Sequence, residues 1–204
     1  MASDILPRSG GRGRTKEAQA AREEAILQAI LDLLSEGGYG AVTTDAIAAR
    51  ADVSKATIYR KWTTKSELLI AALGRVIQPV VVPDLGSFRA EVSYFLERRL
   101  EQYSKPGVNR MFAGIVGQSV EDEALATTFH SWVTGQMAAN VQIIERAKAR
   151  GEAGEEFSVE ALATMIAAPL VYRLVWERRA PDRELMDTLV LCLERAIHPE
   201  NRTP

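Results

Sequence analysis

Apolar residues recur at helical spacing along nearly the whole chain, and this periodicity most constrains the fold. In residues 16–36 they stand three and four positions apart, as Ile26, Ala29, Ile30 and Leu33 show, which is the pattern of one buried helix face. No stretch alternates apolar and polar residues over the length of a strand, and no repeat of about 20 to 50 residues is present. The sequence therefore predicts an all-α fold of about nine helices.

One start signal and two stop signals bound the first and fourth predicted helices. The first helix covers residues 16–36 and ends at the glycines of "GGYG". Thr64 and Glu67 form a T-x-x-E capping box that opens the fourth helix, and Pro79 ends it.

Two shorter helices are predicted between them, joined by a tight turn. Thr43 or Thr44 caps the first of the pair, the chain turns at residues 51–53, and Ser54 caps a helix that runs to about Trp62. Two helices joined by a turn of three or four residues form the helix-turn-helix arrangement, which places its second helix in the major groove of DNA.

Prolines and glycines divide the chain into three parts. Residues 1–15 combine Gly, Pro, Ser and Arg without apolar periodicity, which predicts a mobile basic arm. Arg12 and Arg14 of this arm either reach a minor groove or phosphates, or belong to a solvated tail. Pro79 and Pro83 then mark the boundary between residues 16–78 and a second body at 79–204.

The second body contains five predicted helices. The first three lie at about 84–104, 109–118 and 121–150, with breaks at "KPG" and Gly151. The inward face of the long helix is predicted to consist of Leu125, Phe129, Trp132, Val133, Met137, Val141 and Ile144.

The last two helices, at 158–178 and 182–197, are apolar over more of their surface than one core-facing stripe requires. A second copy of the same pair, packed two-fold into a four-helix bundle, would cover them, so a homodimer is predicted. Pro169 is expected to kink the first of these helices or to end it near Ala168, as a packing adjustment or as a hinge. Cys192 is expected to be a small core residue.

Composition narrows the class of protein further. Hydrophobic residues make up 47% and charged residues 25% of the chain, which is typical of a folded globular protein. No apolar run reaches the roughly 18 residues of a membrane span, so we expect a cytoplasmic protein without membrane contact. His130 and His198 have no second ligand at helical spacing, and no catalytic arrangement or cofactor motif is evident. No metal, cofactor or enzymatic activity is therefore predicted.

The second helix of the helix-turn-helix presents polar side chains that suit a DNA groove. Lys55 has the donors to bind guanine O6 and N7, and the small Ala56 lets the backbone approach a thymine methyl. Thr44 and Lys65, at the starts of the flanking helices, can contact phosphates on either side. The net charge is only −2, so the total charge does not indicate DNA binding. The prediction depends instead on where the cations lie along the chain.

Residues 20–73 closely resemble the DNA-binding region of the tetracycline-repressor (TetR) family. The resemblance rests on "GY", "VTTDAIA", "VSKATIYRKW" and "KSELL", which occur in the order and spacing of the family. The segments "PDLGSFRAEV" and "PLVYRLVWE" resemble the ligand-binding and dimerisation body of one branch of the family. The resemblance implies a dimer that binds a palindromic operator, represses nearby genes and dissociates when a small molecule enters the body.

The resemblance also implies roles for individual residues. Lys55, Ala56, Tyr59 and Lys61 would face bases, with phosphate contact as a second possibility for Tyr59. Phosphate contacts would come from Thr44, Thr57, Trp62 and Lys65. Arg60 is expected to be solvated or to face phosphate, and the complete predicted DNA-binding set is Thr43, Thr44, Ser54, Lys55, Ala56, Thr57, Tyr59, Arg60, Lys61, Trp62, Lys65, Arg12 and Arg14.

Aromatic, sulfur-containing and amide side chains in the second body are candidates for an effector pocket, each with core packing as the alternative. Ligand cavities in helical bundles are mostly apolar with a few polar groups, so a lipophilic effector is expected. The candidate residues are Phe95, Tyr103, Met111, Phe112, Phe129, Trp132, Gln136, Met137, Asn140, Tyr172, Arg173 and Trp176.

Two alternatives to a ligand-released repressor remain open at this point. One is a small-molecule-binding or enzymatic helical protein whose N-terminal unit only packs against the body. The other is an activator that carries the same DNA-binding unit and is controlled by a protein partner.

Overall fold

The computed structural model describes residues 10–198, and this part of the chain consists of helices and loops without a β-strand. The all-α prediction is confirmed. Nine α-helices and one short 3-10 helix are present among these residues: α1 (Gly10–Gly37), η1 (Tyr39–Ala41), α2 (Thr44–Arg50), α3 (Lys55–Tyr59), α4 (Lys65–Val76), α5 (Phe88–Tyr103), α6 (Val108–Ser119), α7 (Glu123–Ala149), α8 (Val159–Val175) and α9 (Arg183–Ile197). Within the described residues, no helix is both long and apolar enough to cross a membrane.

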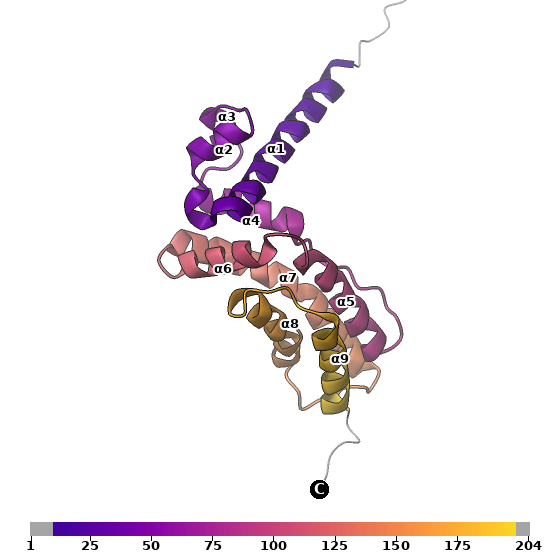
Figure 1. Cartoon of the computed structure of the whole chain (residues 1–204). Helices are drawn as coiled ribbons and strands as arrows, with labels where there is room; N and C mark the ends of the chain where they lie inside the picture. The colour runs from indigo at the N-terminus through magenta and orange to yellow at the C-terminus, as the bar shows by residue number, and fades with distance from the viewer. Residues whose placement is uncertain (1–9, 199–204) are drawn as a thin grey trace, which may run out of the picture.

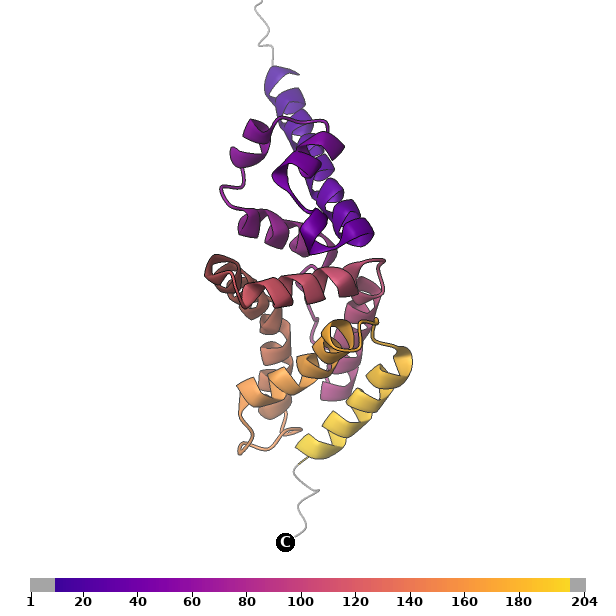
Figure 2. The same ribbon diagram turned by 60° about the vertical axis from the view of Figure 1, so that its left-hand side comes forward.

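The helices form two parts that meet at α4. Helices α1 to α3 lie at one end of an elongated molecule and α5 to α9 at the other, as Figure 1 and Figure 2 show. The core of the N-terminal part is made by Ile30 of α1, Ile47 of α2, Ile58 of α3 and Leu69 of α4, each at most 1% exposed. Because Ile58 of α3 belongs to the core that α1, α2 and α4 also form, this core fixes the orientation of α3.

Side-chain caps fix where most of the helices begin. Thr43 accepts a hydrogen bond from the Ala46 amide, Ser54 from Thr57 and Thr64 from Glu67. Thr43, rather than Thr44, is thus the cap of α2. The Glu67 carboxylate closes the capping box and also accepts from the amide and the hydroxyl of Thr63, one residue before the cap.

Helix α1 begins earlier than the sequence predicts. Its backbone is helical from Gly10, six residues before the predicted start at Lys16, so residues 10–15 of the predicted arm belong to a helix. Once a helix exists, each added residue contributes a further backbone hydrogen bond, and extension needs no apolar periodicity. Residues 1–9 of the predicted arm lie outside the described residues.

Helices α3 and α8 also differ from their predictions. Helix α3 ends at Tyr59 rather than near Trp62, and a turn follows. Helix α8 continues through Pro169 to Val175 instead of ending at Ala168. A proline inside a helix removes one hydrogen bond, and apolar burial on both sides of Pro169, at Ile166 and Leu170, keeps this helix in place.

The outer face of α8 and α9 is apolar and exposed. Tyr172 and Trp176 stack with their ring centroids 6.0 Å apart, and Trp176 is 67% exposed. Met165 and Leu191 are also exposed, and the prediction that Cys192 is a core residue is wrong for the single chain. The buried positions of α9 are Met186, Val190, Leu193 and Ile197, which recur at helical spacing, and Cys192 does not belong to this series.

Candidate functional sites

A tight turn places α3 across α2. The amide of Val53 donates to the carbonyl of Ala48 over 3.0 Å, and Asp52 adopts φ 51°. The left-handed region is costly for most residues, but Asp tolerates it better than most. Because this turn is closed and Ile58 is buried, the polar side of α3 must face solvent.

The outward side of α3 brings together most of the predicted base-facing residues. Ser54, Lys55, Ala56, Tyr59 and Arg60 are exposed, and Tyr59 is 50% exposed. Thr57 is half-buried, with its hydroxyl 3.0 Å from that of Ser54.

Tyr59 also connects the two helices of the motif. Its hydroxyl lies 3.1 Å from Oγ1 of Thr44 at the start of α2. Each hydroxyl has a single proton, and one of the two protons is used in this hydrogen bond. Only the other hydroxyl can therefore donate to a phosphate or a base while the bond lasts, and a phosphate that accepts from both must break it.

The cations of this surface have carboxylate partners in the absence of DNA. The Lys55 ammonium pairs with Asp45, and that hydrogen bond raises the pKa of Lys55. Lys61 pairs with Glu23 of α1, and its hydrogen bond lowers the pKa of the Glu23 carboxyl. Asp45 and Glu23 were not among the predicted site residues. Ion pairs this exposed contribute little to stability, so both lysines are free to exchange these partners for DNA.

Lys65 and Trp62 are placed by packing. The Lys65 ammonium lies 4.3 Å from the ring centroid of Tyr39, and desolvation lowers the pKa of Lys65. Tyr39 was not among the predicted site residues, although "GY" is one of the motifs that resemble the TetR family. The Trp62 ring is only 7% exposed, with Lys61 over its face at 5.2 Å. Packing is therefore the main role of Trp62, and the phosphate contact proposed for it is limited to a small exposed edge.

Arg12 and Arg14 lie in the first turns of α1, and their side chains are outside what the structure describes. In Figure 1 these turns project away from the body, beyond α2 and α3. The N-terminal end of α1 therefore lies at the same end of the molecule as α3.

Comparison with known proteins agrees with this geometry. Residues 26–72 match the family model described as bacterial regulatory proteins, tetR family, and residues 82–193 match the tetracyclin repressor-like C-terminal domain. The chain belongs to the TetR family. It is a helix-turn-helix transcription regulator, and its family is one of DNA-binding proteins.

Similar proteins of the TetR family align over most of the chain. The uncharacterized HTH-type transcriptional regulator YdeS of Bacillus subtilis is 31% identical over 166 residues, which cover 80% of this chain and 82% of YdeS. The DNA-binding transcriptional repressor TetR of Mycobacteroides abscessus is 29% identical over 90% of this chain and 96% of its own. The crystal structure of a TetR regulator from Agrobacterium tumefaciens has a TM-score of 0.67 at 21% identity, over 88% of this chain and 96% of that one, and shares its fold.

In the body of this TetR-family chain, a cavity of about 60 Å³ lies between α5, α6, α7 and α8. Seven of the predicted effector-pocket residues line it: Phe95, Tyr103, Phe112, Trp132, Gln136, Met137 and Asn140. The ring of Phe112 lies edge-on to the rings of Tyr103 and Trp132, with each pair of centroids 6.0 Å apart.

Five predicted pocket residues lie elsewhere. Phe129 packs against Phe112 and Trp132, and Met111 lines a different cavity, next to α1. Tyr172 and Trp176 point outward, and Arg173 pairs with Glu177. The prediction placed these last three in the pocket because α8 is apolar on nearly all sides, so its inward face was not evident.

Arg99 was missed by the sequence analysis, yet it lines the cavity and is 2% exposed. It lies four residues from both Phe95 and Tyr103, on the same face of α5. From that spacing, Arg99 could have been predicted as a pocket residue.

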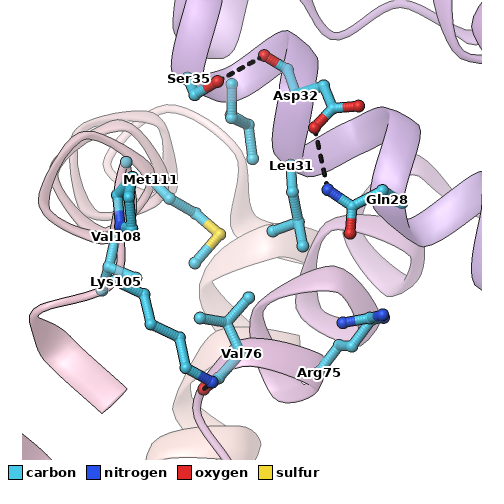
Figure 3. A pocket seen from close by; sticks show the side chains of 12 residues that line it. Gln28, Leu31, Asp32, Ser35, Arg75, Val76, Lys105, Val108 and Met111 are labelled. Carbon is cyan, nitrogen blue, oxygen red and sulfur yellow. Dashed lines mark hydrogen bonds between the residues drawn. The ribbon is translucent and has the colours of Figure 1, made fainter. Parts of the chain in front are cut away.

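The two parts of the regulator meet around a second cavity, of about 340 Å³. Figure 3 shows Leu31 and Ser35 of α1 on one side of it, Val76 of α4 below, and Val108 and Met111 of α6 opposite. Outside the cavity, Arg110 of α6 donates to the carbonyl of Ser35 over 2.6 Å. A shift of α6 would therefore be transmitted directly to α1.

Proposed function

We propose that this regulator is a repressor that binds a palindromic operator as a homodimer in the cytoplasm and dissociates when a lipophilic small molecule occupies the cavity of the body. Residues up to 78 form the DNA-binding part of this proposal, and residues 79–204 form the effector-binding and dimerisation part. The main support for this proposal is the exposed polar face of α3, which a closed turn holds in place.

DNA recognition is assigned to the side chains that the fold exposes. Lys55 and Ala56 are the proposed base readers, and Lys61 joins them once it leaves Glu23. The Thr44 and Tyr59 hydroxyls and the Lys65 ammonium are the proposed phosphate contacts, because they flank α3 on both sides. Phosphate contacts position a protein and base contacts provide specificity.

Dimerisation is assigned to the exposed apolar face of α8 and α9. Large exposed apolar patches are uncommon on monomers, and here Met165, Tyr172 and Trp176 follow one side of α8. A second copy covering this face would place two α3 helices on one side of a two-fold dimer. Their separation must be near one DNA turn, about 34 Å, for both to enter successive major grooves.

Selection of duplexes from a random library by the full-length protein tests this function. A two-fold symmetric consensus with half-sites about one turn apart is expected, together with a dimer in analytical ultracentrifugation at micromolar concentration. A monomer that enriches no consensus would contradict the proposal. Transcription from a promoter that carries the consensus should fall when the protein is added, and a rise would make it an activator.

A further inference from the structure

Arg99 is a fully buried cation without a carboxylate partner among residues 10–198. Its Nη1 donates to the Gln78 carbonyl over 3.1 Å and to Oε1 of Gln102 over 2.9 Å. Its Nη2 donates to Oε1 of Gln136 over 2.9 Å. All of these acceptors are neutral. A buried charge without a counter-ion is costly, and burial lowers the pKa of Arg99.

Asn140 of α7, which lines the same cavity, is also incompletely paired. It is 1% exposed, and its Nδ2 donates to the carbonyl of Ala163 over 3.1 Å. Its Oδ1 has no hydrogen-bond partner among the described residues. Buried polar atoms are almost always paired, so two polar groups with unmet requirements line one small cavity.

Apart from these two residues, Gln136 and the Tyr103 hydroxyl, the lining of the cavity is apolar and suits a hydrocarbon tail. Phe112, Trp132 and Leu170 contribute rings and methyl groups to it. At about 60 Å³ the cavity is much smaller than the roughly 300 to 1,000 Å³ of typical ligand sites. A ligand must therefore move side chains to enter, and its binding would favour a different conformation.

A groove of about 770 Å³ on the outside of the body offers a route to the cavity. Val133 and Met137 of α7 line both the groove and the cavity. Met is unbranched and adapts readily to new neighbours, so a change of Met137 rotamer is a simple way to open the passage. The exposed Val81 lines the outer side of the groove.

We propose that the effector is an amphipathic carboxylate, whose charged group binds the Arg99 guanidinium and whose apolar tail extends toward Phe112 and Met137. The proposal rests on the function proposed above and specifies the chemistry of its effector. A planar guanidinium matches a carboxylate with two parallel hydrogen bonds. A single buried cation neutralises one negative charge, which favours a carboxylate over a phosphate monoester.

Arg99 also holds the segment that follows the DNA-linked helix. The Gln78 carbonyl, two residues beyond the end of α4, accepts from Arg99 and, over 3.2 Å, from Nε2 of Gln102. A carboxylate that takes the Nη donors of Arg99 would withdraw one of these two hydrogen bonds. The end of α4 would then be held less firmly, and α4 belongs to the core that orients α3.

A matched set of probes tests this assignment on the full-length protein. The set consists of octanoate, decanoate, dodecanoate and 4-phenylbutanoate, each with its primary amide and its amine, titrated by isothermal calorimetry. We expect at least one carboxylate to bind 10-fold or more tightly than its amide, and the amines to bind more weakly still. No advantage for any carboxylate over its amide would overturn the proposal.

The variant Gln136→Glu supplies the missing counter-ion without a change of shape. Its carboxylate would occupy the position of the Gln136 amide that already accepts from Arg99, so the advantage of carboxylate probes should disappear while the affinity for amides stays. Ser131→Glu adds the same charge at an exposed position of α7 that lines neither the groove nor the cavity, and it should keep the advantage. Retention of the advantage in Gln136→Glu would overturn the assignment of Arg99.

Operator binding is measured by fluorescence anisotropy on the same preparations. Wild-type protein that binds the selected duplex but prefers no carboxylate would refute this inference alone. Protein that prefers carboxylates, loses the preference in Gln136→Glu and binds no duplex would refute the proposed function instead.

Discussion

The two ends of α5 bury opposite charges in opposite ways. Glu91 is 0% exposed and is bonded over 2.9 Å by Arg146 of α7 and by Arg150, the C-cap of α7. Arg99, two turns further along, is 2% exposed and has only amide and carbonyl acceptors. Glu91 and Arg99 are equally buried, but only Glu91 has a counter-ion, which indicates that the two residues have different roles. The Glu91 cluster joins α5 to α7, and Arg99 retains a charge for a ligand to neutralise.

Removing the charge of Glu91 should have the largest effect on stability. Glu91→Gln leaves Arg146 without its carboxylate, while Arg150 keeps Glu152 and Asp84. The variant is expected to lower the free energy of unfolding by about 3 kcal/mol, measured by urea denaturation. Glu97→Gln, at an exposed position of the same helix, should change it by less than about 0.5 kcal/mol. Similar small effects for both variants would remove the distinction between the two ends of α5.

Adding a negative charge beside Arg99 should instead increase the stability of the protein. Gln136→Glu is expected to raise the free energy of unfolding by about 1.5 kcal/mol, because a charge-assisted hydrogen bond is roughly twice as strong as a neutral one. Urea denaturation measures this change in the free energy of unfolding, and Ser131→Glu is the control for the added charge. A destabilised Gln136→Glu would mean that Arg99 is already adequately neutralised by its amide partners.

The exposed lysines are a third case, in which the counter-ion is one that DNA can replace. Lys55→Ala should lower the preference for the selected duplex over a scrambled one by about fivefold, measured by anisotropy at fixed salt. Stability should not change, because the pair with Asp45 is exposed. Lys148→Ala, in the body, serves as the control, and an unchanged preference in Lys55→Ala would remove Lys55 from base recognition.

Lys65 should show the smallest effect and a different signature. Lys65→Ala is expected to weaken binding to all duplexes by about threefold and to reduce the slope of log affinity against log salt by about 1. Affinity measured at several salt concentrations on selected and scrambled duplexes checks this. A loss confined to the selected duplex would instead make Lys65 a base reader.

The N-terminal part of the fold was largely predictable because its signals are local. Ser54 and Thr64 act as the caps that their positions indicate, and the glycines after Glu36 end α1. The start of α1 at Gly10 was not predictable, since an exposed helix turn leaves no apolar pattern.

The cavity was only partly predictable because it depends on packing between distant segments. Arg98 and Arg99 are adjacent and chemically identical in sequence, yet Arg98 pairs with Glu101 and Arg99 is buried. Tyr172 and Trp176 belong to a helix with apolar residues on most sides, so periodicity could not separate the cavity-facing Leu170 from the outward-facing rings. Only the tertiary contacts of α8 decide between them.

Release of the selected operator duplex by the best-binding carboxylate tests the central claim most directly, because it joins Arg99 to α3 in one measurement. Anisotropy of the labelled duplex should fall as this carboxylate is added to wild-type protein. It should stay unchanged with the matched amide, and with Gln136→Glu at the same concentration. Equal release from wild type and Gln136→Glu, or no release from either, would contradict the account.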